Sequence, residues 1–229
     1  MRLVKWEHLP DNMRNEKVRP YYDILRKKEG SLIAKRIFDV AGSTVLIIIL
    51  SPLMAGIAIC IKIDSKGPVI FKQSRVTQYG REFKIFKFRT MIENAENVGS
   101  QVTHSNDFRI TRVGSKIRKV RLDELPQLFN ILTGDMTFVG TRPEVLKYVS
   151  YYTDEMMATL LLPAGVTSKA SVWYKDEDAI LTNESDIDLA YVNKVLPNKM
   201  KLNLDGLKQF SCWDDIKTIL LTVKVVIKF

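Results

Sequence analysis

The sequence predicts a mainly helical α/β protein with a re-entrant or spanning membrane segment near its N-terminus and amphipathic interfacial helices. Residues 40–61 carry no charge, which is the pattern of a helix that enters a bilayer. The alternation in residues 83–88, Phe-Lys-Ile-Phe-Lys-Phe, is typical of a strand. These observations predict an N-terminal extension over residues 1–31, a membrane hairpin over residues 32–64 and a cytosolic domain over residues 65–229.

The uncharged run spans 22 residues and would extend roughly 33 Å as a helix, about the thickness of a bilayer core. Ser51 and Pro52 lie at its midpoint, where proline bends a helix and the serine hydroxyl can bond a carbonyl left free. Basic residues flank both ends, whereas a spanning helix usually has them on one side. The pattern favours a re-entrant hairpin and a kinked spanning helix equally, ahead of a buried core helix. The position and length of the run argue against a signal peptide.

The net charge of +9 is concentrated in residues 62–121, which contain 14 basic and 5 acidic residues. Such a surface indicates an anionic partner: nucleic acid, an anionic membrane or a phosphate-bearing substrate. The chain lacks a nucleic-acid recognition motif and its residues 151–190 are acidic, so we expect no nucleic acid partner. The two cysteines and two histidines are widely separated, which argues against a disulfide framework and a zinc site.

The remaining elements follow from turn and helix signals. Residues 1–30 predict short helices interrupted at Pro10 and Pro20, and glycines at 67 and 80 mark the turns before two strands. Residues 92–108 predict a helix followed by a mobile loop, and a basic helix ends near Arg121. An apolar helix follows and ends near Gly134, and a turn over residues 138–144 leads into another helix. Residues 163–172 predict a loop, and residues 213–229 a core helix or an amphipathic helix on the bilayer surface.

Two adjacent carboxylates, Asp123 and Glu124, lie between a strongly basic stretch and an apolar run. Acidic residues at a helix start are ordinary, because the amide end of a helix favours negative charge. A lone Asp123 here would most simply be a helix N-cap, with Pro126 in the first turn. Acidic residues set among many arginines indicate instead a carboxylate that acts on a phosphate.

Several further blocks occur in order along the chain, and jointly they resemble the bacterial sugar transferases, the monotopic polyprenyl-phosphate phosphoglycosyltransferases. The blocks are Lys35-Arg36-Ile37-Phe38-Asp39, Ser51-Pro52, Gly67-Pro68-Val69-Ile70-Phe71-Lys72-Gln73-Ser74-Arg75, Lys87-Phe88-Arg89-Thr90-Met91, Leu122-Asp123-Glu124-Leu125-Pro126-Gln127, Gly134-Asp135-Met136 and Arg142-Pro143. The resemblance covers about residues 32–229. The chain is similar to the small form of the family, a catalytic domain with a short N-terminal addition.

The resemblance implies transfer of a phosphosugar from a UDP-sugar to undecaprenyl phosphate, with release of UMP. This reaction is the first membrane step of cell-surface glycan assembly (capsule or exopolysaccharide) or of glycoconjugate assembly. The resemblance also implies a re-entrant hairpin broken at Ser51 and Pro52, on the cytoplasmic face of the bacterial inner membrane. An N-acetylated aminosugar fits the small form, with galactose or glucose as the alternative. A homodimer is compatible with a membrane enzyme of this type.

The resemblance also implies roles for individual residues. Asp123 is the expected nucleophile, forming an aspartyl-phosphosugar intermediate, and Glu124 holds the metal or positions the acceptor phosphate. Mg²⁺ held by Asp123 and Glu124 would neutralise charge together with basic side chains. Asp39 is expected to pair with Arg36 or cap the membrane helix. The expected phosphate-binding residues are Arg118 and Arg142, and with weaker support Lys87 and Arg89.

A non-catalytic membrane-surface scaffold of a glycan assembly pathway is the alternative function. Unchanged glycan output from an Asp123→Ala strain would favour it. The sequence also departs from the family pattern: Pro163-Ala164-Gly165-Val166-Thr167-Ser168 replaces a Pro-Gly-Ile/Leu-Thr-Gly loop, and Arg121 stands where a small hydroxyl residue is frequent. These changes remove no expected catalytic group. The changed loop leaves the sugar open, because loops on a fixed scaffold usually set specificity.

Overall fold

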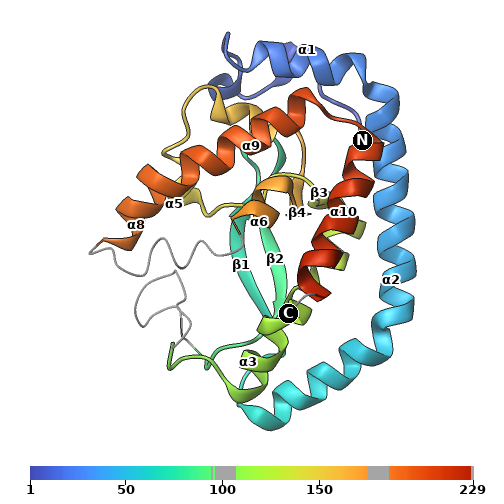
Figure 1. Cartoon of the computed structure of the whole chain (residues 1–229), viewed down its shortest axis with the longest axis vertical. Helices are drawn as coiled ribbons and strands as arrows, with labels where there is room; N and C mark the ends of the chain where they lie inside the picture. Colours follow the sequence, from blue (N-terminus) through green and yellow to red (C-terminus); the bar gives the residue numbers. More distant parts are fainter. Residues whose placement is uncertain (94, 96–106, 175–185, 228–229) are drawn as a thin grey trace.

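A computed structural model describes residues 1–93, 95, 107–174 and 186–227. A long helix, α2 (Glu29–Asp64), runs down one side of the molecule and turns beneath the remaining elements (Figure 1). The other α-helices within the described residues are α1 (Arg19–Lys27), α3 (Arg112–Lys119), α4 (Gln127–Thr133), α5 (Leu146–Val149), α6 (Lys169–Trp173), α8 (Ile187–Ala190), α9 (Leu196–Lys208) and α10 (Cys212–Ile227). The helix and loop predicted over residues 92–108 lie almost entirely outside the described residues.

The N-terminal residues form two short 3-10 helices, η1 (Trp6–His8) and η2 (Asp11–Met13), followed by α1. Pro20 lies in the first turn of α1, so it begins this helix rather than interrupting one. Leu3 and Leu25 are buried in the same apolar cluster as residues of α9. Lys28 Nζ donates to the carbonyl of Phe210 at 2.6 Å. The N-terminal extension is therefore packed into the main core.

Helix α2 is assigned as one helix of 36 residues with Pro52 inside it, and Figure 1 shows a bend between its two halves. Pro52 has no N–H, so the carbonyl of Ile48 loses its helical donor. Ser51 Oγ donates to that carbonyl at 2.8 Å, as expected from the sequence. The break at Ser51 and Pro52 is thus a bend within a continuous helix. By length and composition α2 could cross a membrane, and 17% of its most apolar window is buried.

Both ends of α2 are held by the same globular body. Near its start, Lys35 Nζ lies 2.7 Å from Asp215 Oδ2 of α10. At its end, Asp64 Oδ2 accepts a hydrogen bond from the backbone N–H of Val113 at 2.9 Å. The bend allows this arrangement, because a straight helix of this length would extend roughly 54 Å.

Asp39 has a structural role, but not with the partner expected from the sequence. Its carboxylate accepts hydrogen bonds from Thr137 Oγ1 at 2.7 Å and from the backbone N–H of Phe138 at 3.1 Å. Arg36 instead donates to the carbonyl of Ile131 at the end of α4. Asp39 therefore joins α2 to a strand, a contact between residues about a hundred positions apart that no local pattern could reveal.

The structure contains two small sheets in its described part. Strands β1 (Ile70–Val76) and β2 (Glu82–Phe88) pair antiparallel, and both were predicted. Strands β3 (Met136–Val139) and β4 (Ala164–Thr167) pair in parallel. The prediction of a loop over residues 163–172 was wrong, because this segment contains β4 and most of α6. Both are too short for a periodic signal, and β4 is stabilised by its pairing with β3.

Candidate active site

The Asp123-Glu124 pair lies in a 3-10 turn, η5 (Leu122–Glu124), that continues into α4. Leu122 and Leu125 pack against an apolar cluster formed by α2, β2 and α3. Leu128 belongs to the neighbouring cluster of β2, α4, β3 and β4. Residues three apart share one side of a helical turn, so these leucines fix the turn to the core. Asp123 and Glu124 lie between two of these anchored leucines.

Glu124 is surrounded by three basic side chains. Its Oε1 lies 2.5 Å from Arg142 Nη2, 3.3 Å from Lys87 Nζ and 3.6 Å from Arg121 Nη1, and its side chain is 11% exposed. Burial alone would raise the pKa of Glu124, but Arg142, Lys87 and Arg121 outweigh it and hold that pKa well below its usual range. Glu124 is therefore an ionised carboxylate held in place by its partners.

Asp123 has a different environment. Its residue exposure is 8%, and its buried Oδ1 has no hydrogen-bond partner in the described part of the chain. Burial and the neighbouring charge of Glu124 raise the pKa of Asp123, against the opposing effect of Lys87 and two arginines. The alternative of a capping aspartate is not supported, because α4 has Pro126 at its N-cap and no side-chain capping bond there. The fold therefore leaves an oxygen of Asp123 unpaired.

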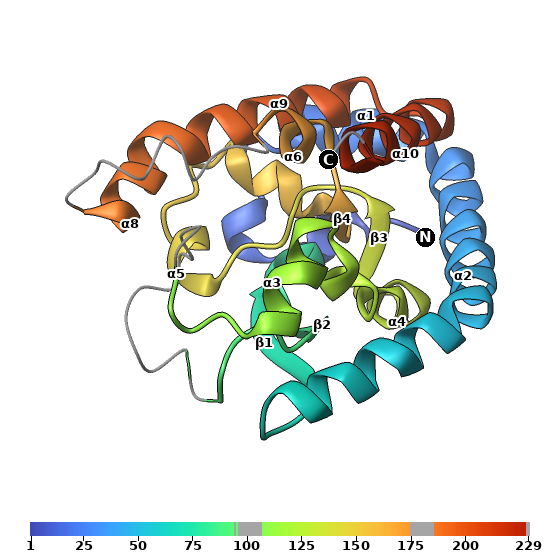
Figure 2. The same cartoon turned by 60° about the horizontal axis from the view of Figure 1, so that its bottom comes forward.

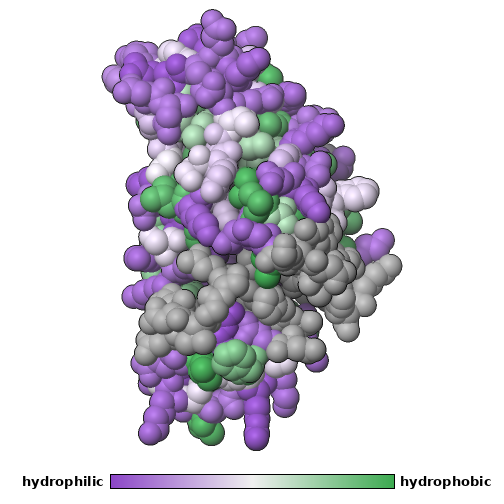
Figure 3. Space-filling view, turned by 90° about the vertical axis from the view of Figure 1, so that its left-hand side faces the viewer, coloured by the Kyte–Doolittle hydropathy of each residue, from purple (hydrophilic) through white to green (hydrophobic). Residues whose placement is uncertain are grey.

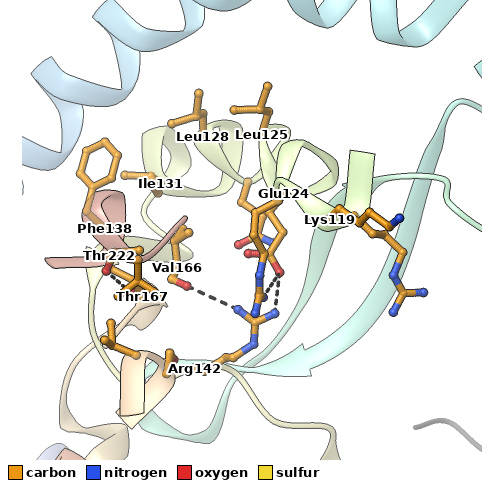
Figure 4. Close-up of a pocket in the computed structure, with 16 residues that line it drawn as sticks. Lys119, Glu124, Leu125, Leu128, Ile131, Phe138, Arg142, Val166, Thr167 and Thr222 are labelled. Atoms are coloured by element: carbon orange, nitrogen blue, oxygen red, sulfur yellow. Dashed lines mark hydrogen bonds and ion pairs between the residues drawn. The ribbon is translucent and has the colours of Figure 1, made fainter. Parts of the chain in front are cut away.

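A cavity of about 400 Å³ lies beside this turn. Figure 4 shows Arg142 directed toward Glu124 on one side, with Phe138, Thr167 and Thr222 on the other. The wall combines basic side chains, apolar side chains and a smaller number of neutral polar and acidic ones. The lining residues are Arg118, Lys119, Arg121, Glu124, Leu125, Gln127, Leu128, Ile131, Phe138, Arg142, Val166, Thr167, Ser171, Val172, Thr222 and Val225. Such a lining suits a ligand with an anionic part and a less polar part.

The structure separates the four predicted phosphate-binding residues. Arg118 and Arg142 line the cavity, and Lys87 contacts Glu124 from β2. Burial lowers the pKa of Lys87, and Glu124 opposes that effect. Arg89 lies elsewhere: it is buried, and its Nη2 donates to the carbonyl of Ser65 at 2.7 Å beyond the end of α2. Three of the four are thus positioned around the carboxylate pair.

Three contributors to the site were not predicted from the sequence. Arg121 pairs with Glu124 from a left-handed backbone conformation with φ 58°. Gln127 lines the cavity, and its place in the Leu-Pro-Gln motif was the available signal. Thr222 reaches the cavity from α10, where its hydroxyl bonds that of Thr167 at 2.8 Å. No local pattern indicates that the C-terminal helix contributes to this wall.

The residues present fit a magnesium ion that binds together with a diphosphate. The described part of the chain has no group of three or more His, Cys, Asp and Glu side chains that could hold a metal alone. Mg²⁺, however, is usually held by one or two carboxylates together with substrate phosphates and water. Asp123 and Glu124 supply such carboxylates, and Oδ1 of Asp123 has no competing partner among the described residues.

Comparison with known proteins identifies several relatives. The chain is 34% identical to the UDP-N-acetylgalactosamine-undecaprenyl-phosphate N-acetylgalactosaminephosphotransferase of Aeromonas hydrophila, over 98% of this chain and 49% of that protein. It is 33% identical to the UDP-glucose:undecaprenyl-phosphate glucose-1-phosphate transferase of Escherichia coli K12, over 93% of this chain and 44% of that protein. It is 34% identical to the undecaprenyl-phosphate galactose phosphotransferase of Salmonella typhimurium LT2, over 88% of this chain and 42% of that protein.

The chain thus spans about half the length of these relatives, whose names carry three different sugars. The bacterial sugar transferase family matches residues 30–229, the region that contains the bent helix, the carboxylate pair and the cavity. This match covers most of the chain and agrees with the blocks noted in the sequence. The chain therefore belongs to the bacterial sugar transferase family.

Proposed function

We propose that this chain transfers a phosphosugar from a UDP-sugar to undecaprenyl phosphate through a covalent intermediate on Asp123. The observation that carries the proposal is the unlike environment of two adjacent carboxylates. Glu124 is held by three basic residues with a depressed pKa, which makes it a weak nucleophile. Asp123 has a raised pKa and an unpaired oxygen, which makes it the more basic and more available of the two.

The proposed reaction has two steps at phosphorus. In the first, a carboxylate oxygen of Asp123 attacks the phosphorus that bears the sugar, and the bond to the UMP oxygen breaks with its electron pair. In the second, an oxygen of the lipid phosphate attacks the same phosphorus, and the bond to Asp123 breaks to regenerate the carboxylate. Asp123 is not among the residues that line the cavity, so the proposed attack requires its carboxylate to turn toward the cavity when the donor binds.

Basic residues make an attack by an anion on an anion feasible. Arg142 and Arg118, on the cavity wall, would bind the diphosphate, since guanidinium groups pair with phosphate oxygens in a bidentate manner. Glu124 would orient Arg142 through their 2.5 Å contact. Mg²⁺ held by the carboxylate pair would supply further neutralisation of the diphosphate charge.

We further propose that α2 is re-entrant, with both ends on the cytoplasmic face of the membrane. A spanning helix would separate its ends across the bilayer, yet here both are bonded to one globular body. Ile48, Ile49, Ile59 and Ile63 are among the exposed apolar residues of α2. The face opposite α2 is mainly hydrophilic where its residues are described (Figure 3). This asymmetry supports an arrangement in which the lipid phosphate and the soluble nucleotide meet at one membrane interface.

The test is UMP release by the purified chain in lipid nanodiscs that contain undecaprenyl phosphate, with and without Mg²⁺, across a panel of UDP-sugars. We expect continued UMP release only with the lipid phosphate, and no UMP release in Asp123→Asn. When the acceptor is omitted, UMP release should stop once each chain carries a phosphosugar. Asp215→Asn is a matched control, because it removes a carboxylate that binds Lys35 far along the chain from the pair. A folded chain without turnover, and unchanged glycan output from an Asp123→Ala strain, would favour the scaffold.

A further inference from the structure

Gln127, the first residue of α4, has a buried side-chain amide without a partner. The residue is 1% exposed, and neither Nε2 nor Oε1 has a hydrogen-bond partner in the described part of the chain. Asn130 in the same helix is equally buried, but its amide is paired: Nδ2 donates to the carbonyl of Lys84, and Oδ1 accepts from the N–H of Phe86, both at 2.9 Å. Buried amides are nearly always paired, so the unpaired amide of Gln127 indicates that it binds a ligand rather than another part of the fold.

The place of this amide limits what it can contact. The backbone is helical through Leu125 and Pro126, so Gln127 lies one turn beyond the carboxylate pair. Side chains three and four residues apart on such a turn have Cβ atoms about 5–6 Å apart. Gln127 also lines the cavity beside Glu124. A ligand whose phosphorus meets Asp123 would therefore bring the group attached to that phosphorus next to the amide.

The chemistry of the amide selects among the parts of a UDP-sugar. A primary amide both donates and accepts, whereas a phosphate oxygen only accepts and would leave Oε1 unpaired. The uracil ring can donate and accept, but a second phosphate and a ribose separate it from the attacked phosphorus. The sugar is bonded to that phosphate through C1. Its neighbouring C2 carries a hydroxyl or an acetamido group, and each of these both donates and accepts.

We propose that Gln127 hydrogen-bonds the C2 substituent of the donor sugar and sets the preference between a hydroxyl and an acetamido group there. This inference rests on the proposed function and deepens it. A site that hydrogen-bonds a substrate group discriminates strongly against a substrate that leaves its buried polar atoms unpaired. Among the described residues that line the cavity, Gln127 is the one whose buried side-chain polar atoms have no hydrogen-bond partner, so its amide is the group that a sugar substituent would satisfy.

The test compares the full chain in nanodiscs with Gln127→Leu, which keeps the size of the side chain but removes both polar atoms. Donors are compared in pairs that differ only at C2: UDP-glucose with UDP-N-acetylglucosamine, and UDP-galactose with UDP-N-acetylgalactosamine. For each pair, the ratio of kcat/KM values measures the preference at C2. Inhibition by UMP measures binding of the nucleotide alone. Gln78→Leu is the matched control, because the Gln78 amide bonds the carbonyl of Leu161 outside the cavity.

We expect Gln127→Leu to reduce the ratio within the preferred pair about tenfold, which corresponds to the loss of one hydrogen bond. The inhibition constant of UMP should change less than twofold, and Gln78→Leu should leave the ratio unchanged. An unchanged ratio in Gln127→Leu would overturn the inference. Equally weakened inhibition by UMP would also overturn it, because the amide would then bind the nucleotide rather than the sugar. If the wild type turns over no sugar, the proposed function fails. Calorimetric binding of the same donors and UMP then tests Gln127 without turnover.

Discussion

Glu124→Gln isolates the contribution of charge in the site, because it keeps the shape of the side chain. Glu124 Oε1 lies 2.5 Å from Arg142 and 3.3 Å from Lys87. At an effective dielectric constant of about 20, these contacts correspond to gross attractions of about 7 and about 5 kcal/mol. Desolvation of the charges offsets most of this, and removing one partner of a buried pair typically costs about 3–5 kcal/mol. A glutamine can still accept one hydrogen bond from Arg142, so we expect a loss of about 3 kcal/mol.

A loss of this size should lower the Tm by about 6–12 °C for a chain of this length. The assay is thermal unfolding in nanodiscs at one scan rate, followed by tryptophan fluorescence. Glu29→Gln is the matched control, since the Glu29 side chain is 34% exposed and its nearest arginine contacts are 3.7 and 3.9 Å. Such a surface pair contributes at most about 1 kcal/mol. If Glu124→Gln melted like Glu29→Gln, the three basic residues would not be held by Glu124, and our account of its depressed pKa would be wrong.

Four further predictions concern Asp123, the pH dependence of UMP release, Gly114 and Asp39. The raised pKa of Asp123 means that the fold favours its protonated form. The contribution of Asp123 to the free energy of unfolding therefore falls as the pH rises past the pKa that this residue has in the unfolded chain. Asp123→Asn should raise the Tm at pH 7 and abolish UMP release. On acidification, UMP release by the wild type should decline at a pH above the pKa of an ordinary aspartate, which is about 3.9. Gly114→Ala should lower the free energy of unfolding by about 1–3 kcal/mol, because a Cβ there would clash with the backbone carbonyl oxygen of Thr90. Gly206→Ala is the control, because a Cβ there meets no atom within 4 Å and should not destabilise the fold. Asp39→Asn should lower the Tm by a few degrees, because an amide cannot accept both hydrogen bonds from β3; an unchanged Tm would contradict this role.

Local patterns in the sequence were sufficient for several elements. Alternation predicted β2, and glycine marked the ends of its hairpin. The proline and the serine before it predicted a bend in α2 and the bond that accommodates it. Each of these signals acts between residues within about one helical turn or one strand pair.

The environment of each carboxylate was decided by the tertiary structure. Glu124 meets Lys87 and Arg142, which lie 37 and 18 positions away, so its depressed pKa depends on how β2 and the segment after β3 pack around the turn. The same packing buries Asp123 and Gln127, and within the described part of the chain it leaves Oδ1 of Asp123 and the amide of Gln127 without hydrogen-bond partners.

The sequence by itself determined that an Asp-Glu pair lies at the start of a helix among basic residues. It also determined that the N-terminal apolar helix is bent at a proline. It could not determine which basic residue reaches which carboxylate, or that α10 and β4 complete the cavity wall. Helix formation depends mainly on neighbouring residues, whereas β4 also requires its pairing with the distant β3. Burial, ion pairing and cavity walls arise from contacts between distant segments, and these form only when the whole chain packs.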